Sequence, residues 1–187
     1  MLLIVDPQID FISGSLPVPD AAEKIKNLAD YVLAYSEKYK VIAVTEDWHP
    51  LNHCSFKENG GQWPVHCVQN TRGASIEPYL FSALKQTGGI LEILHKGDKS
   101  EREEYSVFQN ESSALRLDNL IHTHQIKQID ICGIAGDICV LSTLNDGIKR
   151  YGNSIFSVLT QFCPSLDGGV AITKAAKAIE KKSFVHP

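Results

Sequence analysis

The chain alternates short runs of apolar residues with longer stretches in which apolar residues recur every three or four positions. Short apolar runs are typical of buried strands, and the three-to-four-residue recurrence is typical of helices that cover a sheet. The runs predict strands at residues 2–5, 41–45, 90–94, 126–133 and 154–159, with a short sixth strand at 183–186. The recurrence predicts helices at residues 18–36, 114–123, 138–151 and 170–182.

This order of elements predicts an α/β fold. Strands that alternate with helices favour parallel pairing, because each helix carries the chain back to the start of the next strand. We therefore expect a three-layer αβα arrangement with a doubly wound, mainly parallel sheet of about six strands. The chain has 187 residues and no internal repeat, low-complexity tract or linker, which predicts a single domain over residues 1–187.

Charge and cysteine content narrow the environment and the partners. A formal net charge of -4 gives no reason to expect nucleic acid or an anionic membrane surface as a partner. The first apolar run, MLLIV, is too short to span a bilayer. Five cysteines at scattered spacing favour free thiols in a reducing, cytoplasmic location. Each cysteine must then be explained by packing, metal binding or catalysis.

The segment 46–72 fits no regular element, although it contains three of the seven histidines and both tryptophans. A long irregular insert in a compact domain is usually functional. Ligands of open parallel sheets bind beyond the carboxyl ends of the strands. The reactive side chains that follow the predicted strands, and that we expect to converge there, are Asp6, Asp47, His49, His95, Lys96 and Cys139.

Cys139 is the candidate nucleophile, because it falls in the first turn of a predicted helix. Free amide groups and the helix dipole at that position favour a thiolate, and Lys96 would lower the thiol pKa further. Asp6 would accept the proton, which gives an Asp-Lys-Cys triad. The tight turn at residues 133–136 would leave amide groups free to stabilise an oxyanion.

Each of these residues also has a structural interpretation. Asp6 beside Pro7 is typical of a turn, and Lys96 would then be an exposed loop residue. A buried Cys139 would then be a small apolar side chain. The joint placement of all three at strand ends favours catalysis, although spacing alone does not decide it.

The same irregular segment contains a candidate metal site. Neutral imidazoles with one carboxylate suit zinc, iron or manganese, and three protein ligands leave positions open for substrate or water. The candidate ligands are Asp47, His49, His53 and His66. The alternatives are histidines on a polar loop, or a structural zinc that uses Cys54 or Cys67. The cysteines lack paired CxxC spacing, which disfavours structural zinc.

Six motifs follow one another along the chain: VDPQIDF at 5–11, TEDWHPLNHCSF at 45–56, WPVHCVQNTRGA at 63–74, HKG at 95–97, EYSVF at 104–108 and GIAGDICV at 133–140. By the order and spacing of these motifs, the chain resembles the nicotinamidases of the isochorismatase-like cysteine hydrolases over essentially its full length. Relatives without nicotinamidase activity commonly keep the triad motifs but lose the metal set, so the presence of both indicates the subfamily.

The resemblance assigns roles to the residues of the triad and its surroundings. Asp6 would be the general base, Lys96 the charge-stabilising partner and Cys139 the nucleophile. The amides of Ala135 and Cys139 would form the oxyanion hole, next to a cis bond between Ile134 and Ala135.

The resemblance also assigns the metal ligands and the substrate contacts. Asp47, His49 and His66 would bind the metal. His53 would be a fourth ligand, or it would contact one of the metal ligands without binding the metal itself. The residues that would contact the substrate ring are Phe11, Trp63, Tyr105 and Ala135.

The activity implied by this resemblance is a metal-dependent amidohydrolase. It would convert nicotinamide to nicotinate and ammonia through a cysteine thioester, would act on pyrazinamide as well, and would serve NAD salvage. One divalent metal ion is implied, with zinc favoured over manganese and iron. The resemblance leaves open whether the chain forms a homo-oligomer. The chain departs from many relatives at Gly136, where a hydroxyl residue is common, and at Glu104, where serine or aspartate is common.

Three other interpretations compete with a nicotinamidase. The first is another amide or ether hydrolase of the same fold, whose substrate lacks a pyridine nitrogen. The second is a metal-binding module without catalytic activity, in which Cys139 would be unreactive. The third, a dinucleotide-dependent oxidoreductase, is disfavoured because no GxGxxG follows the first strand.

Overall fold

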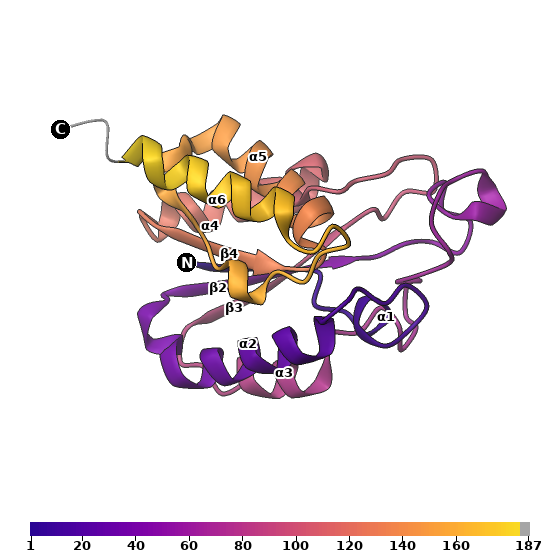
Figure 1. Ribbon diagram of the computed structural model, residues 1–187, viewed down its shortest axis with the longest axis horizontal. Coiled ribbons are helices and arrows are strands. Elements are labelled where there is room, and N and C mark those ends of the chain that lie inside the picture. Colours follow the sequence, from indigo (N-terminus) through magenta and orange to yellow (C-terminus); the bar gives the residue numbers. More distant parts are fainter. Residues whose placement is uncertain (184–187) are drawn as a thin grey trace.

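The computed structural model describes residues 1–183, and these form a five-stranded sheet covered by helices on both faces (Figure 1). All strand pairs are parallel, and the strand order is β3-β2-β1-β4-β5. The strands are β1 (Leu2–Val5), β2 (Val41–Asp47), β3 (Ile90–Lys96), β4 (Ile129–Gly133) and β5 (Phe156–Val158).

The helices form the two outer layers, which confirms the predicted three-layer αβα arrangement. One face carries α2 (Ala21–Tyr35) and α3 (Pro78–Leu84), which pack against each other. The other face carries α4 (Glu111–Thr123), α5 (Leu141–Tyr151) and α6 (Val170–Ser183). A short helix, α1 (Ile9–Ile12), follows β1.

The central strand β1 is apolar along its whole length, as expected for a strand that helices cover on both sides. All four residues of β1 are completely buried. Buried parallel strands are typically continuous apolar runs rather than alternating ones. This explains why the strands were recognisable from sequence as apolar runs.

Several boundaries differ from the prediction. The ladder between β2 and β3 continues to the pair Asp47 and Lys96, so both strands run two residues further than their apolar runs. The predicted helix at 138–151 begins earlier, as a turn of π-helix (Gly136–Val140) that leads into α5.

Two helices were not predicted from the sequence, α1 and α3, and a strand was predicted at the end of another helix. The longer of the two, α3, has Pro78 in its first turn and Glu77 as its N-cap; the Glu77 side chain accepts a hydrogen bond from the Leu80 amide. The sixth strand was predicted at residues 183–186, but Ser183 ends α6 and the other residues lie outside the described part. The sheet therefore has five strands within residues 1–183, rather than about six.

The sheet topology fixes where a ligand would bind. β1 lies between β2 and β4, so the chain switches direction of winding at the carboxyl end of β1. Ligand sites of open α/β sheets form at such switch points. In Figure 1 the strand arrows point toward the side from which the irregular segment after β2 projects. Within residues 1–183, no helix has the length and apolar character needed to cross a membrane.

Candidate active site

Asp6 is the first residue after β1, and its backbone is fixed by the neighbouring strand. Its φ of 47° lies in the left-handed region, which aspartate tolerates better than most side chains. The Asp6 amide donates to the Thr45 carbonyl over 3.0 Å. The Thr45 hydroxyl donates to Asp6 Oδ1 over 2.6 Å, which leaves Oδ2 to face the other catalytic candidates.

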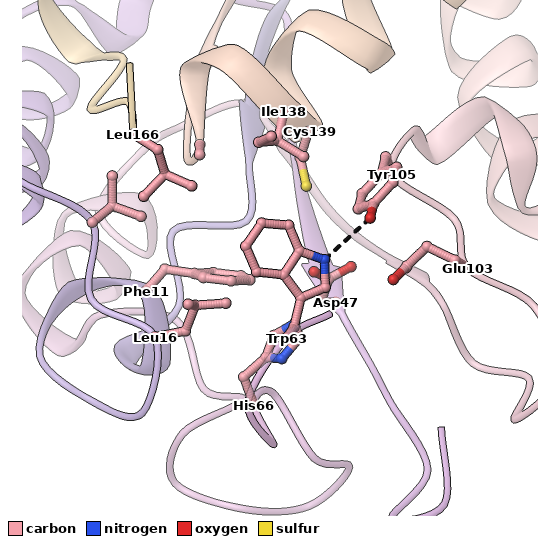
Figure 2. Close-up of a pocket in the computed structure, with 12 residues that line it drawn as sticks. Phe11, Leu16, Asp47, Trp63, His66, Glu103, Tyr105, Ile138, Cys139 and Leu166 are labelled. Atoms are coloured by element: carbon pink, nitrogen blue, oxygen red, sulfur yellow. Dashed lines mark hydrogen bonds between the residues drawn. The ribbon is translucent and has the colours of Figure 1, made fainter. Parts of the chain in front are cut away.

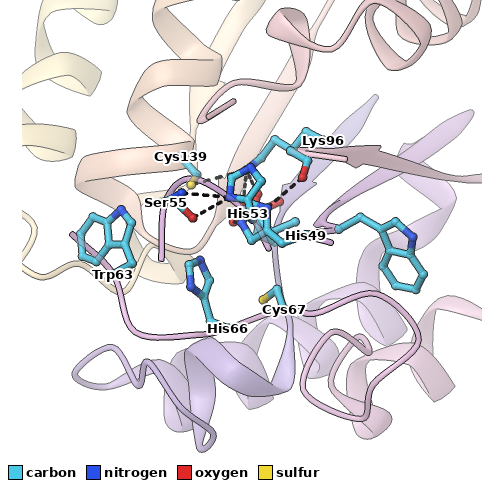
Figure 3. A network of polar contacts seen from close by, with 12 residues as sticks. His49, His53, Ser55, Trp63, His66, Cys67, Lys96 and Cys139 are labelled. Carbon is cyan, nitrogen blue, oxygen red and sulfur yellow. Dashed lines mark hydrogen bonds and ion pairs between the residues drawn. The ribbon is translucent and has the colours of Figure 1, made fainter. Parts of the chain in front are cut away.

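Lys96, the last residue of β3, brings the triad together. Its side chain is completely buried, and its Nζ lies 2.8 Å from Asp6 Oδ2 and 2.5 Å from Asp47 Oδ1. The same Nζ lies 3.6 Å from Cys139 Sγ. The structure therefore joins Asp6, Lys96 and Cys139 in direct contact, as the positions at the strand ends predicted. Figure 3 shows Lys96 and Cys139 close to His49 and His53.

One ammonium and two carboxylates are ion-paired in this buried cluster. Burial lowers the pKa of Lys96, but Asp47 and Asp6 outweigh burial and raise that pKa well above its ordinary value, so the ammonium persists. Burial raises the pKa of Asp6 to about 6, with Lys96 opposing the shift. Asp6 is therefore a carboxylate near neutral pH, with a proton affinity much higher than that of an exposed aspartate.

The sequence analysis was wrong about the resting state of Cys139. Lys96 does lower the thiol pKa, but burial raises it, and the carboxylates of Asp6 and Asp47 raise it further. The net effect is a pKa well above the ordinary value, so the resting sulfur is a thiol. A nucleophilic role for Cys139 would therefore require the loss of its proton to a neighbour, and the Asp6 carboxyl is within hydrogen-bonding reach.

The turn before Cys139 shows why glycine is required at residue 133. Gly133 has a φ of +122°, and a Cβ there would lie 2.0 Å from the Val5 carbonyl oxygen. The bond between Ile134 and Ala135 is cis, as the resemblance implied. Two amides of the turn are not free, because Ile134 donates to Val5 and Gly136 donates to Pro164. The expectation that this turn leaves its amides free therefore fails for Ile134 and Gly136.

Asp47, His49 and His66 form a compact group that fits a metal ion. One ligand atom from each lies within 4.8 Å of the others. His49 Nε2 lies 3.7 Å from Asp47 Oδ2, and it is buried without a hydrogen-bond partner among residues 1–183. A buried nitrogen left without a partner is costly unless another group satisfies it. A cation between these side chains would do so.

The ring orientations of His49 and His66 also suit metal binding. His49 Nδ1 lies 2.9 Å from the Gly97 carbonyl, and His66 Nδ1 lies 2.7 Å from the Pro64 carbonyl. A carbonyl only accepts, so each Nδ1 must carry the proton, and in the neutral ring the lone pair is then on Nε2. This is the arrangement in which protein carbonyls orient metal-binding histidines. For His49, burial is outweighed by the Asp47 carboxylate, which raises the pKa of the ring, so metal binding would displace a proton from Nε2. Burial lowers the pKa of His66, which favours its neutral form.

His53 lies beside this group with both ring nitrogens engaged. Its Nδ1 is 2.7 Å from the Ser55 hydroxyl, and its Nε2 is 3.0 Å from the Arg102 carbonyl. Its ring stacks on His49 at a centroid distance of 3.9 Å. These contacts support the interpretation of His53 as a residue that holds His49 in place.

A pocket opens between the triad and the metal group (Figure 2). The predicted aromatic residues line it, and the Trp63 Nε1–H donates to the Tyr105 hydroxyl over 3.1 Å. Figure 2 shows the sulfur of Cys139 pointing into this space. Lining residues that the sequence analysis missed are Leu16, Val18, Glu103, Ile138 and Leu166.

Gln8 is a further residue that the sequence analysis missed. It is completely buried, and its Nε2 donates to the carbonyls of Asp47 (2.7 Å) and Ala74 (2.8 Å). Its Oε1 accepts from the Asp47 amide over 2.8 Å. The side chain of Gln8 therefore holds the backbone of Asp47 by hydrogen bonds. The feature of the sequence that could have indicated this role is a glutamine among the apolar residues of VDPQIDF.

Comparison with known proteins places this geometry in a family. Residues 1–155 match the model of the isochorismatase domain. The chain is 31% identical over 185 residues to the nicotinamidase/pyrazinamidase of Mycobacterium tuberculosis, covering 96% of this chain and 92% of that protein.

Solved structures show the same similarity in three dimensions. The pyrazinamidase of Pyrococcus horikoshii in complex with zinc is 32% identical, with a TM-score of 0.79 over 95% of this chain and 94% of that one. The yeast nicotinamidase bound to the inhibitor nicotinaldehyde is 26% identical, with a TM-score of 0.80 over 97% and 96%. The family model and these relatives span most of the chain, so the chain belongs to the isochorismatase domain family.

Proposed function

We propose that this protein is a metal-dependent nicotinamidase that hydrolyses nicotinamide to nicotinate and ammonia. The observation that carries the proposal is the contact of Lys96 with both Asp6 and Cys139 beside the group of Asp47, His49 and His66. The relatives support it, because those named above are a nicotinamidase/pyrazinamidase, a pyrazinamidase and a nicotinamidase. Pyrazinamide is the second proposed substrate, and NAD salvage is the proposed role.

Asp47, His49 and His66 would hold one divalent ion, for which zinc is the first candidate, with manganese and iron as alternatives. Zinc is proposed because the Pyrococcus horikoshii relative was solved with it, and because imidazole and carboxylate ligands suit it. When bound, the ion would act as a Lewis acid toward the ring nitrogen of the pyridine. Asp47 is ready for this role, because Lys96 and His49 outweigh burial and hold its pKa well below the usual range.

The pocket would orient the substrate ring between aromatic side chains. Phe11, Trp63 and Tyr105 line the space between the metal group and Cys139, so they would pack against the ring. Ala135 lines the same pocket and would contact the amide end. Fixing the amide carbon near the Cys139 sulfur would supply the orientation term of catalysis.

The triad residues would then carry the proton and the acyl group. Asp6 takes the proton from the Cys139 thiol as the sulfur attacks the amide carbon, and the amides of Ala135 and Cys139 stabilise the oxyanion. The protonated Asp6 gives this proton to the amide nitrogen as the C–N bond breaks, which releases ammonia and leaves a thioester. Asp6 next takes a proton from water, whose oxygen attacks the thioester, and gives that proton to sulfur as the C–S bond breaks. The nicotinic acid that leaves loses its own proton to solvent and becomes nicotinate.

Lys96 would stay protonated throughout this cycle. Its ammonium stabilises the developing thiolate at 3.6 Å and the Asp6 carboxylate at 2.8 Å. Burial raises the pKa of Asp6 to about 6. The proton affinity of Asp6 is therefore closer to that of the thiol than the proton affinity of an ordinary aspartate is. Efficient general bases have such intermediate pKa values.

The test is ammonia release from nicotinamide by purified protein, with and without a chelator, beside the Cys139→Ala variant. We expect release that requires both the metal and Cys139. Absence of release from folded, metal-loaded protein would refute the nicotinamidase assignment and direct the search to other amides. Release that survives both the chelator and the substitution would refute the mechanism.

A further inference from the structure

Glu104 is a buried carboxylate that the proposed mechanism does not use. Its side chain is only 1% exposed. Its Oε2 accepts hydrogen bonds from the Gly97 amide over 2.8 Å and from the Asn110 side-chain amide over 3.0 Å. Its Oε1 lies 2.9 Å from Arg102 Nη2. A buried carboxylate is costly unless it is paired and hydrogen-bonded, and both oxygens of Glu104 are.

Two partners of Glu104 hold the histidines of the candidate metal site. The Gly97 carbonyl accepts the Nδ1–H of His49 over 2.9 Å. The Arg102 carbonyl accepts the Nε2–H of His53 over 3.0 Å. One carboxylate thus fixes the two residues whose carbonyls orient these rings.

The packing around Gly97 leaves little room for this arrangement to shift. Gly97 has a φ of +65°, and a Cβ there would lie 2.5 Å from His49 Cε1. The backbone of Gly97 therefore lies directly against the His49 ring, which is stacked on His53 on another side. A movement of Gly97 would displace the His49 ring and, because Lys96 is the preceding residue, would disturb the triad as well.

We propose that Glu104 is a positioning residue that sets the orientation of His49 at the metal site. It acts through Gly97, whose amide donates to Glu104 and whose backbone lies against the His49 ring. This inference rests on the proposed function for the identity of what His49 binds. The orientation of the ring itself is a property of the metal-free chain, and it can be measured there.

Three variants separate the contacts of Glu104. Glu104→Leu removes both acceptor oxygens at similar volume. Glu104→Gln keeps one oxygen, which can still accept from the Gly97 amide. Arg102→Gln is the matched control, because it removes the ion pair at a side chain that is 43% exposed and leaves the contact with Gly97 intact.

Two readouts are needed for each variant. The first is the signal of the His49 Nδ1–H in metal-free protein with ¹⁵N-labelled histidine, which reports the hydrogen bond to Gly97. The second is zinc affinity, measured by competition with a chromophoric chelator. Removing a group that orients a metal-binding histidine typically costs about 10- to 100-fold in metal affinity.

We expect Glu104→Leu to lose the His49 signal and to bind zinc about 10- to 100-fold more weakly. Glu104→Gln should keep the signal because its remaining oxygen still accepts from the Gly97 amide. Arg102→Gln should keep it because a substitution at an exposed side chain usually has little effect. Both variants should stay within about threefold of the parent affinity. Folding of each variant is checked by circular dichroism. If Glu104→Leu does not fold, Glu104→Asp replaces it, because the shorter side chain keeps the charge but retreats from Gly97.

The inference is overturned if the folded Leu variant, or the Asp variant in its place, retains both the parent signal and the parent zinc affinity. A different result separates the two proposals. If the parent chain binds no zinc but its His49 signal is lost on Glu104→Leu, the positioning role of Glu104 stands and the proposed metal-dependent function fails.

Discussion

The triad and the metal group lie side by side but are built in different ways. Asp6 and Lys96 sit at the ends of β1 and β3, and Cys139 sits in the π-helical turn after β4. His49 and His66 instead lie on the irregular segment after β2 and are held by hydrogen bonds to backbone carbonyls.

Because the two groups are held in place by different parts of the structure, we expect different substitutions to disturb them. The parallel sheet fixes the backbone around the triad, so we expect substitutions in the triad to act mainly by changing the ion pairs among its side chains. The histidines depend on side chains such as Glu104 and Ser55, so distant substitutions should disturb them more easily. Asp47 belongs to both regions, because it ends β2, pairs with Lys96 and faces His49.

The largest expected effect is a loss of turnover that leaves metal binding unchanged. Cys139→Ala should lower turnover of nicotinamide by about three orders of magnitude or more, because no other group in the triad can form the thioester. Zinc content should stay at the parent level, since Cys139 is not among the proposed ligands. Turnover is followed by ammonia release and zinc by elemental analysis. A variant that retains full activity would contradict the nucleophile assignment.

Charge balance in the triad is tested by Lys96→Met. This change leaves Asp6 and Asp47 buried without their counter-ion, and breaking a buried pair from one side typically costs about 3–5 kcal/mol of unfolding free energy. Urea denaturation measures the loss. The matched control is Lys26→Met, whose ion pair with Asp30 is exposed and should contribute only about 0–1 kcal/mol. Equal losses in the two variants would contradict the account of the triad.

Removal of a loop-borne ligand should leave the triad intact. His49→Ala should weaken zinc binding by more than about 100-fold, beyond the usual cost of losing an orienting group. Alkylation of Cys139 by iodoacetamide should proceed at the parent rate in the metal-free protein. If zinc affinity is unchanged, His49 is not a ligand; if alkylation changes strongly, the two regions are not independently supported.

The smallest expected effect is a shift in pH dependence. Asp6 must be a carboxylate to accept a proton, and burial raises its pKa to about 6, so kcat/KM should fall about tenfold per pH unit below that value. The Thr45 hydroxyl lowers the Asp6 pKa by its hydrogen bond. Thr45→Val should therefore move the acid limb to higher pH. An acid limb that stays in place would contradict Asp6 as the base.

The strands and the triad could be predicted from sequence for one physical reason. Buried parallel strands are continuous apolar runs, and the first polar residues after them converge at the sheet edge. Asp6 and Lys96 followed from that rule, and Cys139 followed from its place in the first turn of the helix after the fourth strand.

The supporting residues could not be predicted in the same way. Gln8, Thr45 and Glu104 act through contacts with segments 39, 39 and 7 residues away along the chain, and no local pattern reveals such partners. The direction of the Cys139 pKa shift was missed because it depends on burial, which spacing does not report. Both strand ends at Asp47 and Lys96 were missed because their ladder continues beyond the apolar residues.

The central claim is that nicotinamide is hydrolysed through an acyl group on Cys139. Acid quenching during turnover, followed by mass spectrometry of the peptide that contains Cys139, tests it directly. We expect a nicotinoyl adduct on that peptide in the parent chain and none in Cys139→Ala. Steady ammonia release without any adduct on Cys139, or an adduct on another residue, would contradict it.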